Sequence, residues 1–532
     1  MSRCRLQHPR TPLLAGHVLA LGLVLATASV PRPSSAAATQ IEATSRTLEL
    51  RGAGPDEVFG RPLLCVDLDV DGCDDIVVGA DKFHFSGDER PALFIFRGSP
   101  AYRLGGLIDL ARHSPSAVVL GDAGSDNLAT ALAAGDVNGD GAPDLVMADP
   151  SISPQGRTAA GAAYVLLGRR DFFDQTVYDL AAGQWFWMLE GAAAGDDLGG
   201  SNLFGGLQSH GLACGDLNGD HFDDIAVGAH LGTASGRARA GKIHIVFGTD
   251  ARGPGSRIDL LTQSSVVILG PQAENELGTA LAVGNVNGDL YMDLLAGQPL
   301  WSASTFSSEG MAHLFLGKAA WPSAINLASV NADLRVRGAA AGDELGEAVA
   351  VTDVNADGRG EMILTAGGWT PPDQTREAGA AYGIFGSASP AGLINLATTP
   401  PGFFVEGIDI NNDVGRALAA GDFNADGAGD FFLTARDGER PGHNAEGRAF
   451  VIFGSQFDFP ALFRLAQDEA NLIINGGVDN LQLGDTIAAG DVDGDGADEL
   501  LLAAPFVASN TGRVLVFDLN LTALDDILWM AK

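Results

Sequence analysis

Short apolar runs separated by polar, glycine-rich stretches recur along the chain in one fixed order. A run of small residues, as at 131–135, comes before an acidic stretch, and an apolar run such as 224–228 follows it. A third run ends in glycine, as at 163–168, and so does a fourth, as at 266–270. The runs are short and lack the sustained 3.6-residue periodicity of a helix. The pattern therefore predicts a unit of four short strands.

The acidic stretch is a nine-residue segment, approximately D-x-[D/N]-x-D-G-x-x-[D/E], that occurs seven times. The copies begin at residues 67, 136, 216, 285, 353, 422 and 491, so successive starts are 69, 80, 69, 68, 69 and 69 residues apart. Such regular self-similarity is typical of repeat architectures. Seven copies of a four-stranded antiparallel unit predict an all-β fold, a seven-bladed β-propeller whose first strands surround a crowded centre.

The two ends of the repeat array predict how this ring closes. The seventh unit has no fourth strand after its third run at 514–517, whereas an additional apolar run at 47–52 precedes the first unit. Pairing of the N-terminal strand within blade seven would complete that sheet and remove an exposed edge. We therefore expect closure by the N-terminal strand.

The acidic segments have the ligand pattern of a calcium loop. Oxygen-bearing side chains stand at positions one, three, five and nine, and glycine stands at position six in five of the seven copies. Calcium takes about six to eight oxygen ligands, and glycine permits the sharp bend. We expect up to seven calcium ions, held by Asp67, Asp69, Asp71, Asp75, Asp136, Asn138, Asp140, Asp144, Asp216, Asn218, Asp220, Asp224, Asn285, Asn287, Asp289, Asp293, Asp353, Asn355, Asp357, Glu361, Asp422, Asn424, Asp426, Asp430, Asp491, Asp493, Asp495 and Glu499.

Two copies depart from the pattern. His221 replaces the glycine of the third copy, as a tolerated substitution or an additional ligand. The fourth copy begins with Asn285 and has Leu290 at the glycine position, so we expect its site to be the weakest or empty. An EF-hand is excluded because the residue at position twelve of the first copy is Val78, not a bidentate Glu. For any single copy the alternative is an ordinary polar turn between strands.

The motif series resembles the FG-GAP repeats of the integrin α-subunit head. The resemblance is carried by Phe59-Gly60 and Leu277-Gly278 before first strands, by Gly79-Ala80 after the first acidic segment and by Ala504-Pro505 after the last. It covers roughly residues 47–518. The resemblance implies a seven-bladed propeller with calcium loops on one face and ligand contacts in the loops of the opposite face.

The N-terminus has the layout of a secretory leader. Arg3, Arg5 and Arg10 precede an apolar run at 13–28, and small residues at 35–38 offer a cleavage site. We expect a signal peptide at 1–38, a propeller at 39–518 and a C-terminal tail at 519–532, in a protein that is secreted, periplasmic or on the cell surface. An uncleaved anchor is the alternative; we expect no transmembrane span in the mature chain because no second apolar run is long enough.

Composition and the absence of enzyme motifs limit the classes of partner and activity that the chain can have. A net charge of −35 excludes nucleic acid and disfavours anionic membranes as partners. No zinc-protease or hydrolase-elbow motif is present. After the leader three cysteines remain, Cys65, Cys73 and Cys214, of which the first two leave open a local disulfide.

Ligand contacts are expected in the variable loops between second and third strands and in the connections between blades. Aromatic side chains in exposed loops suit sugar stacking or protein contact, while local loop packing is the alternative. The candidate ligand face comprises Asn202, Phe204, His210, Trp301, Phe306 and Trp369. These features favour a binding or adhesion module for an extracellular protein or carbohydrate. An extracellular hydrolase or lyase, or a purely structural surface protein, is the alternative.

Overall fold

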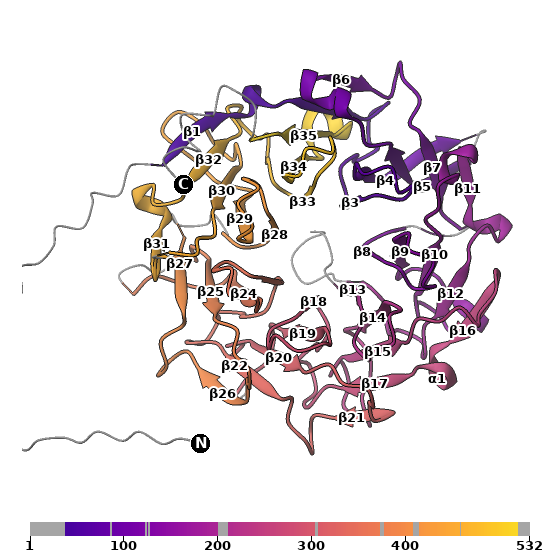
Figure 1. The fold of residues 1–532 in the computed structure, drawn as a ribbon, viewed down its shortest axis with the longest axis vertical. Helices are drawn as coiled ribbons and strands as arrows, with labels where there is room; N and C mark the ends of the chain where they lie inside the picture. The colour runs from indigo at the N-terminus through magenta and orange to yellow at the C-terminus, as the bar shows by residue number, and fades with distance from the viewer. Residues whose placement is uncertain are drawn as a thin grey trace, which may run out of the picture. The chain divides into compact units, whose positions relative to one another are not determined.

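The computed structural model describes residues 38–85, 88–122, 125, 128–200, 211–303, 307–372, 377–407, 414–457 and 459–519. Within this part of the chain, seven β-sheets surround a common centre, as Figure 1 shows. Neighbouring innermost strands contact one another around the whole ring, from the first blade to the seventh and back to the first. The seven-bladed propeller expected from the repeats is confirmed.

Four strands of each blade follow the predicted order. The first, innermost strands are β3 (Leu63–Val66), β8 (Leu132–Gly135), β13 (Leu212–Gly215), β18 (Leu281–Gly284), β23 (Val349–Thr352), β28 (Leu418–Gly421) and β33 (Ile487–Gly490). The second strands are β4 (Asp75–Phe85), β9 (Asp144–Asp149), β14 (Asp224–Ala229), β19 (Asp293–Gln298), β24 (Glu361–Ala366), β29 (Asp430–Ala435) and β34 (Glu499–Ala504).

The outer half of each blade has the same arrangement. The third strands are β5 (Asp88–Phe96), β10 (Ala162–Leu166), β15 (Lys242–Val246), β20 (Met311–Phe315), β25 (Ala380–Ile384), β30 (Arg448–Ile452) and β35 (Arg513–Phe517). The fourth are β7 (Ala117–Leu120), β12 (Trp187–Glu190), β17 (Val266–Leu269), β22 (Leu334–Arg337), β27 (Phe403–Glu406), β32 (Leu472–Asn475) and β2 (Leu48–Arg51). These four strands pair antiparallel throughout, as in the first blade.

A fifth, parallel strand that the sequence did not predict lies at the outer edge of every blade. From blade one to blade seven these strands are β11 (Val177–Asp179), β16 (Ser256–Asp259), β21 (Ala324–Asn326), β26 (Gly392–Asn395), β31 (Leu462–Arg464), β1 (Thr39–Glu42) and β6 (Gly106–Asp109). Except for β1, each comes from the connection between the third and fourth strands of the following blade. The expectation of four-stranded blades is therefore corrected: each sheet has five strands and is mixed.

The N-terminal segment closes the ring, as predicted, and it does so twice. Strand β2 pairs antiparallel with β35, with Leu48 opposite Val516, and becomes the fourth strand of blade seven. Strand β1 pairs parallel with β32 and becomes the fifth strand of blade six. Between blades seven and one, Arg61 Nε lies 2.5 Å from Asp485 Oδ2. Asp485 is buried and also pairs with Arg436 at 3.1 Å, so the seam carries a charge network as well as strands.

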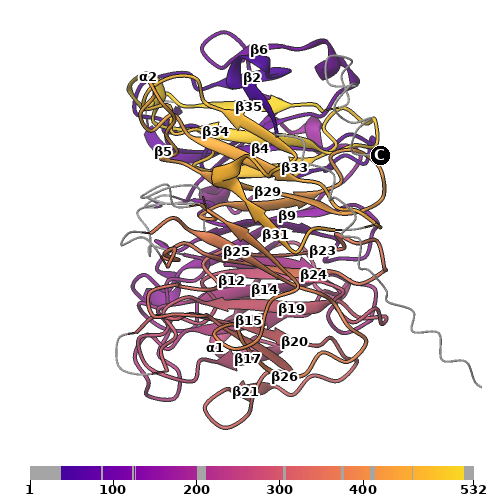
Figure 2. The same ribbon diagram turned by 90° about the vertical axis from the view of Figure 1, so that its left-hand side faces the viewer.

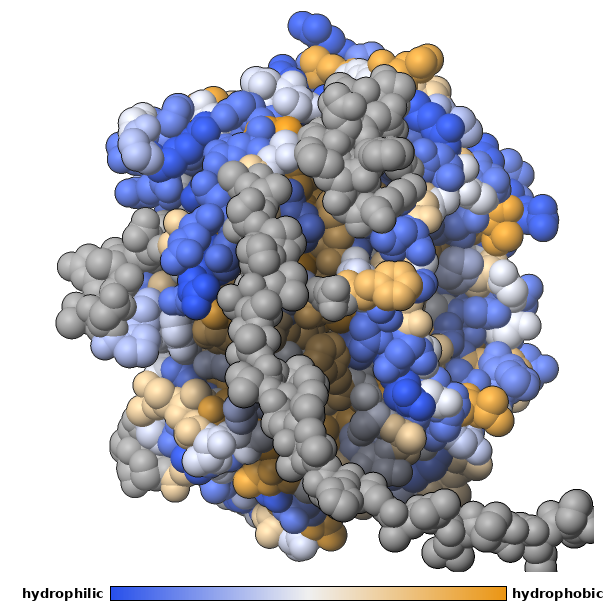
Figure 3. Space-filling model, turned by 60° about the vertical axis from the view of Figure 1, so that its left-hand side comes forward, coloured by the Kyte–Doolittle hydropathy of each residue, from blue (hydrophilic) through white to orange (hydrophobic). Residues whose placement is uncertain are grey.

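The hydrophobic core lies between neighbouring blades. Trp187 is fully buried in a cluster that joins β12 of blade two to Leu212, Ile225 and Val246 of blade three. In the side view of Figure 2 the strands run across the molecule from one end of the ring to the other. On the side displayed in Figure 3, hydrophilic residues cover most of the described surface and hydrophobic ones are scattered.

Helices contribute little to the described residues. They comprise α1 (Leu260–Gln263), α2 (Val507–Asn510) and several single 3-10 turns. No helix within the described ranges is long and apolar enough to cross a bilayer. The predicted leader lies outside the described residues except for Ala38, and the predicted tail except for Leu519. Cys65, Cys73 and Cys214 are free thiols, so the disulfide left open above does not form.

Candidate metal centres

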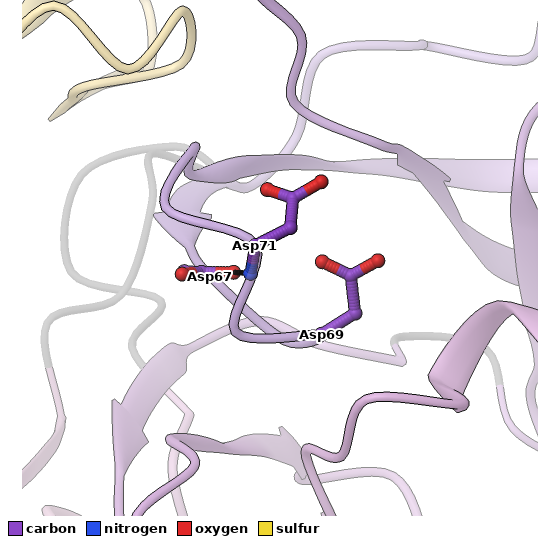
Figure 4. A group of neighbouring side chains, drawn as sticks. All are labelled: Asp67, Asp69 and Asp71. Carbon is purple, nitrogen blue, oxygen red and sulfur yellow. Dashed lines mark hydrogen bonds between the residues drawn. The ribbon is translucent and has the colours of Figure 1, made fainter.

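Each acidic segment is the tight connection between the first and second strands of a blade. In six of the seven, the carboxylate at position one accepts hydrogen bonds from the backbone N–H groups of positions five and six. In the first loop these bonds run to Asp67 from Asp71 at 3.0 Å and from Gly72 at 2.9 Å. Figure 4 shows Asp67, Asp69 and Asp71 projecting from this one turn. The backbone thus fixes the carboxylates before any ligand binds.

Position nine is the buried anchor of every loop. In all seven copies its carboxylate accepts the backbone N–H of position two. In six copies it also accepts the N–H of the glycine that follows the third strand, as Asp144 does from Gly168 at 3.0 Å. All seven of these side chains are at most 2% exposed. Position nine therefore ties the loop to the body of its blade.

Burial at position nine disfavours a bare negative charge. It raises the pKa of Asp75, Asp144, Asp224 and Asp430 to about 8, although backbone hydrogen bonds act in the opposite direction. It also raises the pKa of Glu361 to about 7 and that of Glu499 to about 9. A carboxylate removed from water is stabilised as an anion by a nearby cation. A divalent cation bound in the loop would therefore favour the ionised form of the side chain at position nine.

Three loops bring carboxylate oxygens within 4.8 Å of one another, which is close enough to share an ion. These groups are Asp67, Asp69 and Asp71; Asp353, Asp357 and Glu361; and Asp491, Asp493 and Glu499. Hard oxygen ligands converging from a glycine-containing turn fit calcium better than a transition metal. The donor set of these loops therefore fits the metal that the sequence predicted.

One acidic residue near the seventh loop was missed by the sequence analysis. Asp518 forms a further group with Asp493 and Asp495, and it is 6% exposed. It stands directly after strand β35, where the other blades have Arg97, Leu167, Phe247, Leu316, Phe385 or Phe453. Aligning the residues that follow the third strands would have identified it as the one acid at that position.

The two irregular loops behave differently. His221 adopts a φ of +71° at the glycine position and its N–H still donates to Asp216, at 2.9 Å. A side chain in this left-handed conformation costs roughly 1 kcal/mol relative to glycine, and the turn survives. In the fourth loop the Asn285 side-chain amide instead donates to the Asp289 carbonyl at 2.7 Å, and Leu290 is 92% exposed. The Asn285 amide thus uses the Asp289 carbonyl as its acceptor, and it places an N–H group where a cation needs oxygen ligands.

Arginine side chains contact two of the loops. Arg97 Nη2 lies 2.6 Å from Asp69 and 3.0 Å from Asp71. Arg103 Nη2 lies 3.0 Å from Asp493 and 3.6 Å from Asp495. Both guanidinium groups thus sit between the carboxylates of positions three and five. They partly neutralise the first and seventh loops and would compete with a metal ion there.

The candidate ligand-face residues do not form one described cluster. Trp301 lines a cavity between blades three and four. Trp369 is partly buried and packs edge-on against Phe404 at 5.3 Å, within the cluster between blades four and five. Asn202, Phe204, His210 and Phe306 lie outside the described residues.

The comparisons with known proteins agree with this arrangement of loops and strands. A family model described as "FG-GAP repeat" matches residues 128–166, 210–246 and 483–517. The chain contains FG-GAP repeats. Each matched FG-GAP repeat covers the first three strands of one blade together with its acidic loop, in blades two, three and seven. The repeats and the resemblance to integrin α-subunits are thus confirmed.

Two kinds of curated protein share these repeats. Mouse phosphatidylinositol-glycan-specific phospholipase D is 32% identical over 162 residues, which is 30% of this chain and 18% of the mouse protein. The human protein of the same name is 25% identical over 155 residues, 29% of this chain and 18% of its own length. Rat integrin alpha-7 is 27% identical over 259 residues, 48% of this chain and 19% of the integrin. The chain therefore spans about a fifth of the length of the curated relatives it matches.

Proposed function

We propose that this chain is an exported calcium-binding β-propeller that acts as a binding or adhesion module for an extracellular protein or glycan. The observation that carries the proposal is the separation of the two faces. Every acidic loop joins a first strand to a second strand, so all seven lie at the same end of the blades. The connections between second and third strands lie at the opposite end and are free to vary for recognition.

Calcium has a structural role in this proposal. The ions would be held by the side chains at positions one, three, five and nine of each loop, most weakly in the loop that begins at Asn285. Bound calcium would neutralise carboxylates that otherwise repel one another at short range. The burial of position nine supports this role, because each neutralised loop would be anchored to its own blade.

The remaining organisation belongs to the same proposal. Residues 1–38 would direct export as a signal peptide, residues 39–518 would form the propeller and residues 519–532 a tail. Secretion, the periplasm or the cell surface would supply the calcium concentration that the loops require. Integrin alpha-7 is among the similar proteins, which supports an interaction role.

A catalytic function has no comparable support. The match to phosphatidylinositol-glycan-specific phospholipase D covers 18% of the mouse protein. Among the described residues, every group of acids close enough to share a metal includes residues of the nine-residue loops. The acidic clusters are thus accounted for by the proposed calcium sites.

A binding screen tests the proposal. The mature chain, folded in millimolar calcium, would be applied to arrays of glycans and extracellular matrix proteins, with a chelated sample in parallel. Specific binding that is lost in Trp301→Ala but retained in Leu290→Ser, a change in the exposed fourth acidic loop, is the expected result. A folded protein that binds nothing on either array, or whose binding is lost in Leu290→Ser alone, would contradict it.

A further inference from the structure

Trp301 lines a cavity whose walls combine polar and aromatic side chains. It has a volume of about 250 Å³ and lies between blades three and four. Its walls include Gln272, Trp301, Met311, His313 and Arg335. Strand pairing sets His313 of β20 directly opposite Arg335 of β22, so both side chains leave the sheet on the same face.

The repeat supplies an internal comparison, because the same pair of positions occurs in all seven blades. In five of the other six blades the fourth-strand residue of this pair is apolar. The equivalent pairs are Phe94 with Val118, Tyr164 with Met188, His244 with Val267, Tyr382 with Phe404, Phe450 with Ile473 and Leu515 with Glu49. Glu49 is compensated by close contacts with Arg46 and Arg51. Blade four alone places a histidine beside an arginine.

A third polar residue completes the group. Gln298 ends the second strand of blade four, at a position where five other blades have alanine and blade two has Asp149. His313 Nε2 lies 2.9 Å from Gln298 Oε1. With that oxygen as acceptor, Nε2 carries the proton and Nδ1 is an acceptor. Burial lowers the pKa of His313 to about 3, so the ring is neutral.

Three polar atoms of this group are buried without a hydrogen-bond partner among the described residues. They are His313 Nδ1, Gln298 Nε2 and Arg335 Nε. In a chain with 67 acidic residues, Arg335 also makes no ion pair with a described carboxylate. Leaving a buried polar group unsatisfied is unfavourable, and native structures rarely do so without a reason. A bound ligand would supply the missing partners, and the three residues line or adjoin the cavity.

The three atoms specify the chemistry of the ligand. Gln298 Nε2 and Arg335 Nε donate, so each requires an acceptor, whereas His313 Nδ1 requires a donor. A carboxylate would satisfy the two donors and leave the histidine facing another acceptor. Neighbouring hydroxyl groups both donate and accept, and so satisfy all three atoms. Vicinal hydroxyls of this kind are carried by sugar rings.

The walls and size of the cavity suit a sugar ring. The backbone of Trp301 is held in place because its amide N–H donates to the Gln298 carbonyl and its carbonyl accepts from the Gly310 amide, both at 3.1 Å. The Arg337 guanidinium lies 5.4 Å from the centre of the Trp301 ring and fixes it further. At about 30 Å³ for each water molecule, the volume corresponds to about eight waters. One sugar ring fits this volume.

We propose that the cavity between blades three and four binds a single sugar residue of a glycan, recognising its vicinal hydroxyls through Gln298, His313 and Arg335 and its apolar face through Trp301. This inference rests on the proposed recognition function and names its ligand class and its site. Gln298, His313 and Arg335 come from three adjacent strands of one sheet, which makes the site rigid.

The test uses the full mature chain in millimolar calcium and three probes. These are methyl α-mannopyranoside, methyl β-galactopyranoside and methyl β-glucuronide, titrated by isothermal calorimetry and saturation-transfer NMR. At least one of the two neutral glycosides should bind. The double variant His313→Phe with Arg335→Val reproduces the pair of blade one, Phe94 with Val118, and so should fold with an unchanged or higher Tm. It should weaken binding at least tenfold.

His244→Phe is the matched control, because His244 is the equivalent residue of blade three and is paired with Val267. It should leave glycoside binding unchanged. Binding that survives in the double variant, absence of binding of all three glycosides, or binding of the glucuronide alone would each overturn the sugar site. Macromolecules that bind the double variant as well as the wild type would overturn the site and leave the proposed function standing. If the chain bound a glycoside but bound no glycan or matrix protein on the arrays, the result would support the sugar site and overturn the proposed function.

Discussion

Leu50 tests the closure of the ring. It lies on β2, is fully buried and packs with Val514 and Val516 in the cluster between blades seven and one. Replacing it by alanine removes a buried branched side chain from a closed site, which typically costs about 2–5 kcal/mol of unfolding free energy. For a unit with an unfolding entropy of roughly 1 kcal/mol per K, the Tm would fall by about 2–5 °C. Urea unfolding in millimolar calcium, followed by tryptophan fluorescence, measures the free energy directly.

Leu107 provides the control in the same sheet. It lies on β6, opposite Glu49 in the parallel pairing with β2, and is 43% exposed. Leu107→Ala should cost less than about 1 kcal/mol, because nearly half of this residue stays in water on folding and the rest lies at the edge of the sheet. The reasoning would be refuted if both variants lost the same free energy, or if Leu50→Ala matched the wild type. Equal losses would mean that burial at the seam does not set the cost, and an unchanged Leu50→Ala variant would mean that β2 is not part of the cooperative fold.

Three further predictions concern the loops and the core. With calcium at a hundredfold excess over the Kd, Asp493→Ala should lower the unfolding free energy by about 2–3 kcal/mol, whereas Asn285→Ala should have little effect. Calorimetric melting with and without chelator measures both variants. Equal losses would contradict the metal assignment. Arg97→Met should raise the calcium affinity of the first loop about threefold, because the half-exposed guanidinium of Arg97 competes with the ion for Asp69 and Asp71. Calcium titration measures the affinity, and Arg112→Met, which changes a 77% exposed arginine, is the control. Burial lowers the pKa of His244 to about 3, below the unfolded value of 6.5, so stability should fall as the pH drops below 6.5. The loss is about 2 kcal/mol at pH 5, and a His244→Gln variant with the same pH profile as the wild type would disprove it.

Much of the fold could be predicted because its signals are local and are repeated. The strand runs and acidic loops stand at a fixed spacing, and the missing fourth strand of the last unit matches the additional run at 47–52. The fifth strands could not be predicted in this way. Gly106–Asp109, for example, is four residues long and half exposed, and it is held by pairing with β2 from a distant part of the chain. A short strand that forms only by pairing with a distant strand has no clear alternation of apolar and polar residues by which it could be predicted.

The candidate sites likewise differ in whether local sequence alone could predict them. The ligand set of the acidic loops follows from sequence spacing, since position one is bonded to positions five and six, and position nine to position two, within the same nine residues. Arg103 and Asp518 approach the seventh loop from opposite ends of the sequence, so their proximity appears only in the closed ring. The group of Gln298, His313 and Arg335 likewise requires the registers of three strands. The sequence shows each residue as an isolated exception, and the sheet brings the three together.

The fifth strands have a consequence for dividing the molecule into fragments. Each of the first six units of sequence places four strands in one sheet and one strand in the preceding sheet, so its boundaries do not coincide with those of a blade. A fragment cut between two of these units lacks the last strand of its final sheet, and its first unit carries a strand whose partner sheet is missing. Both ends would present open edges to other chains. We therefore expect a fragment cut between sequence units to associate with other chains more readily than the whole ring does.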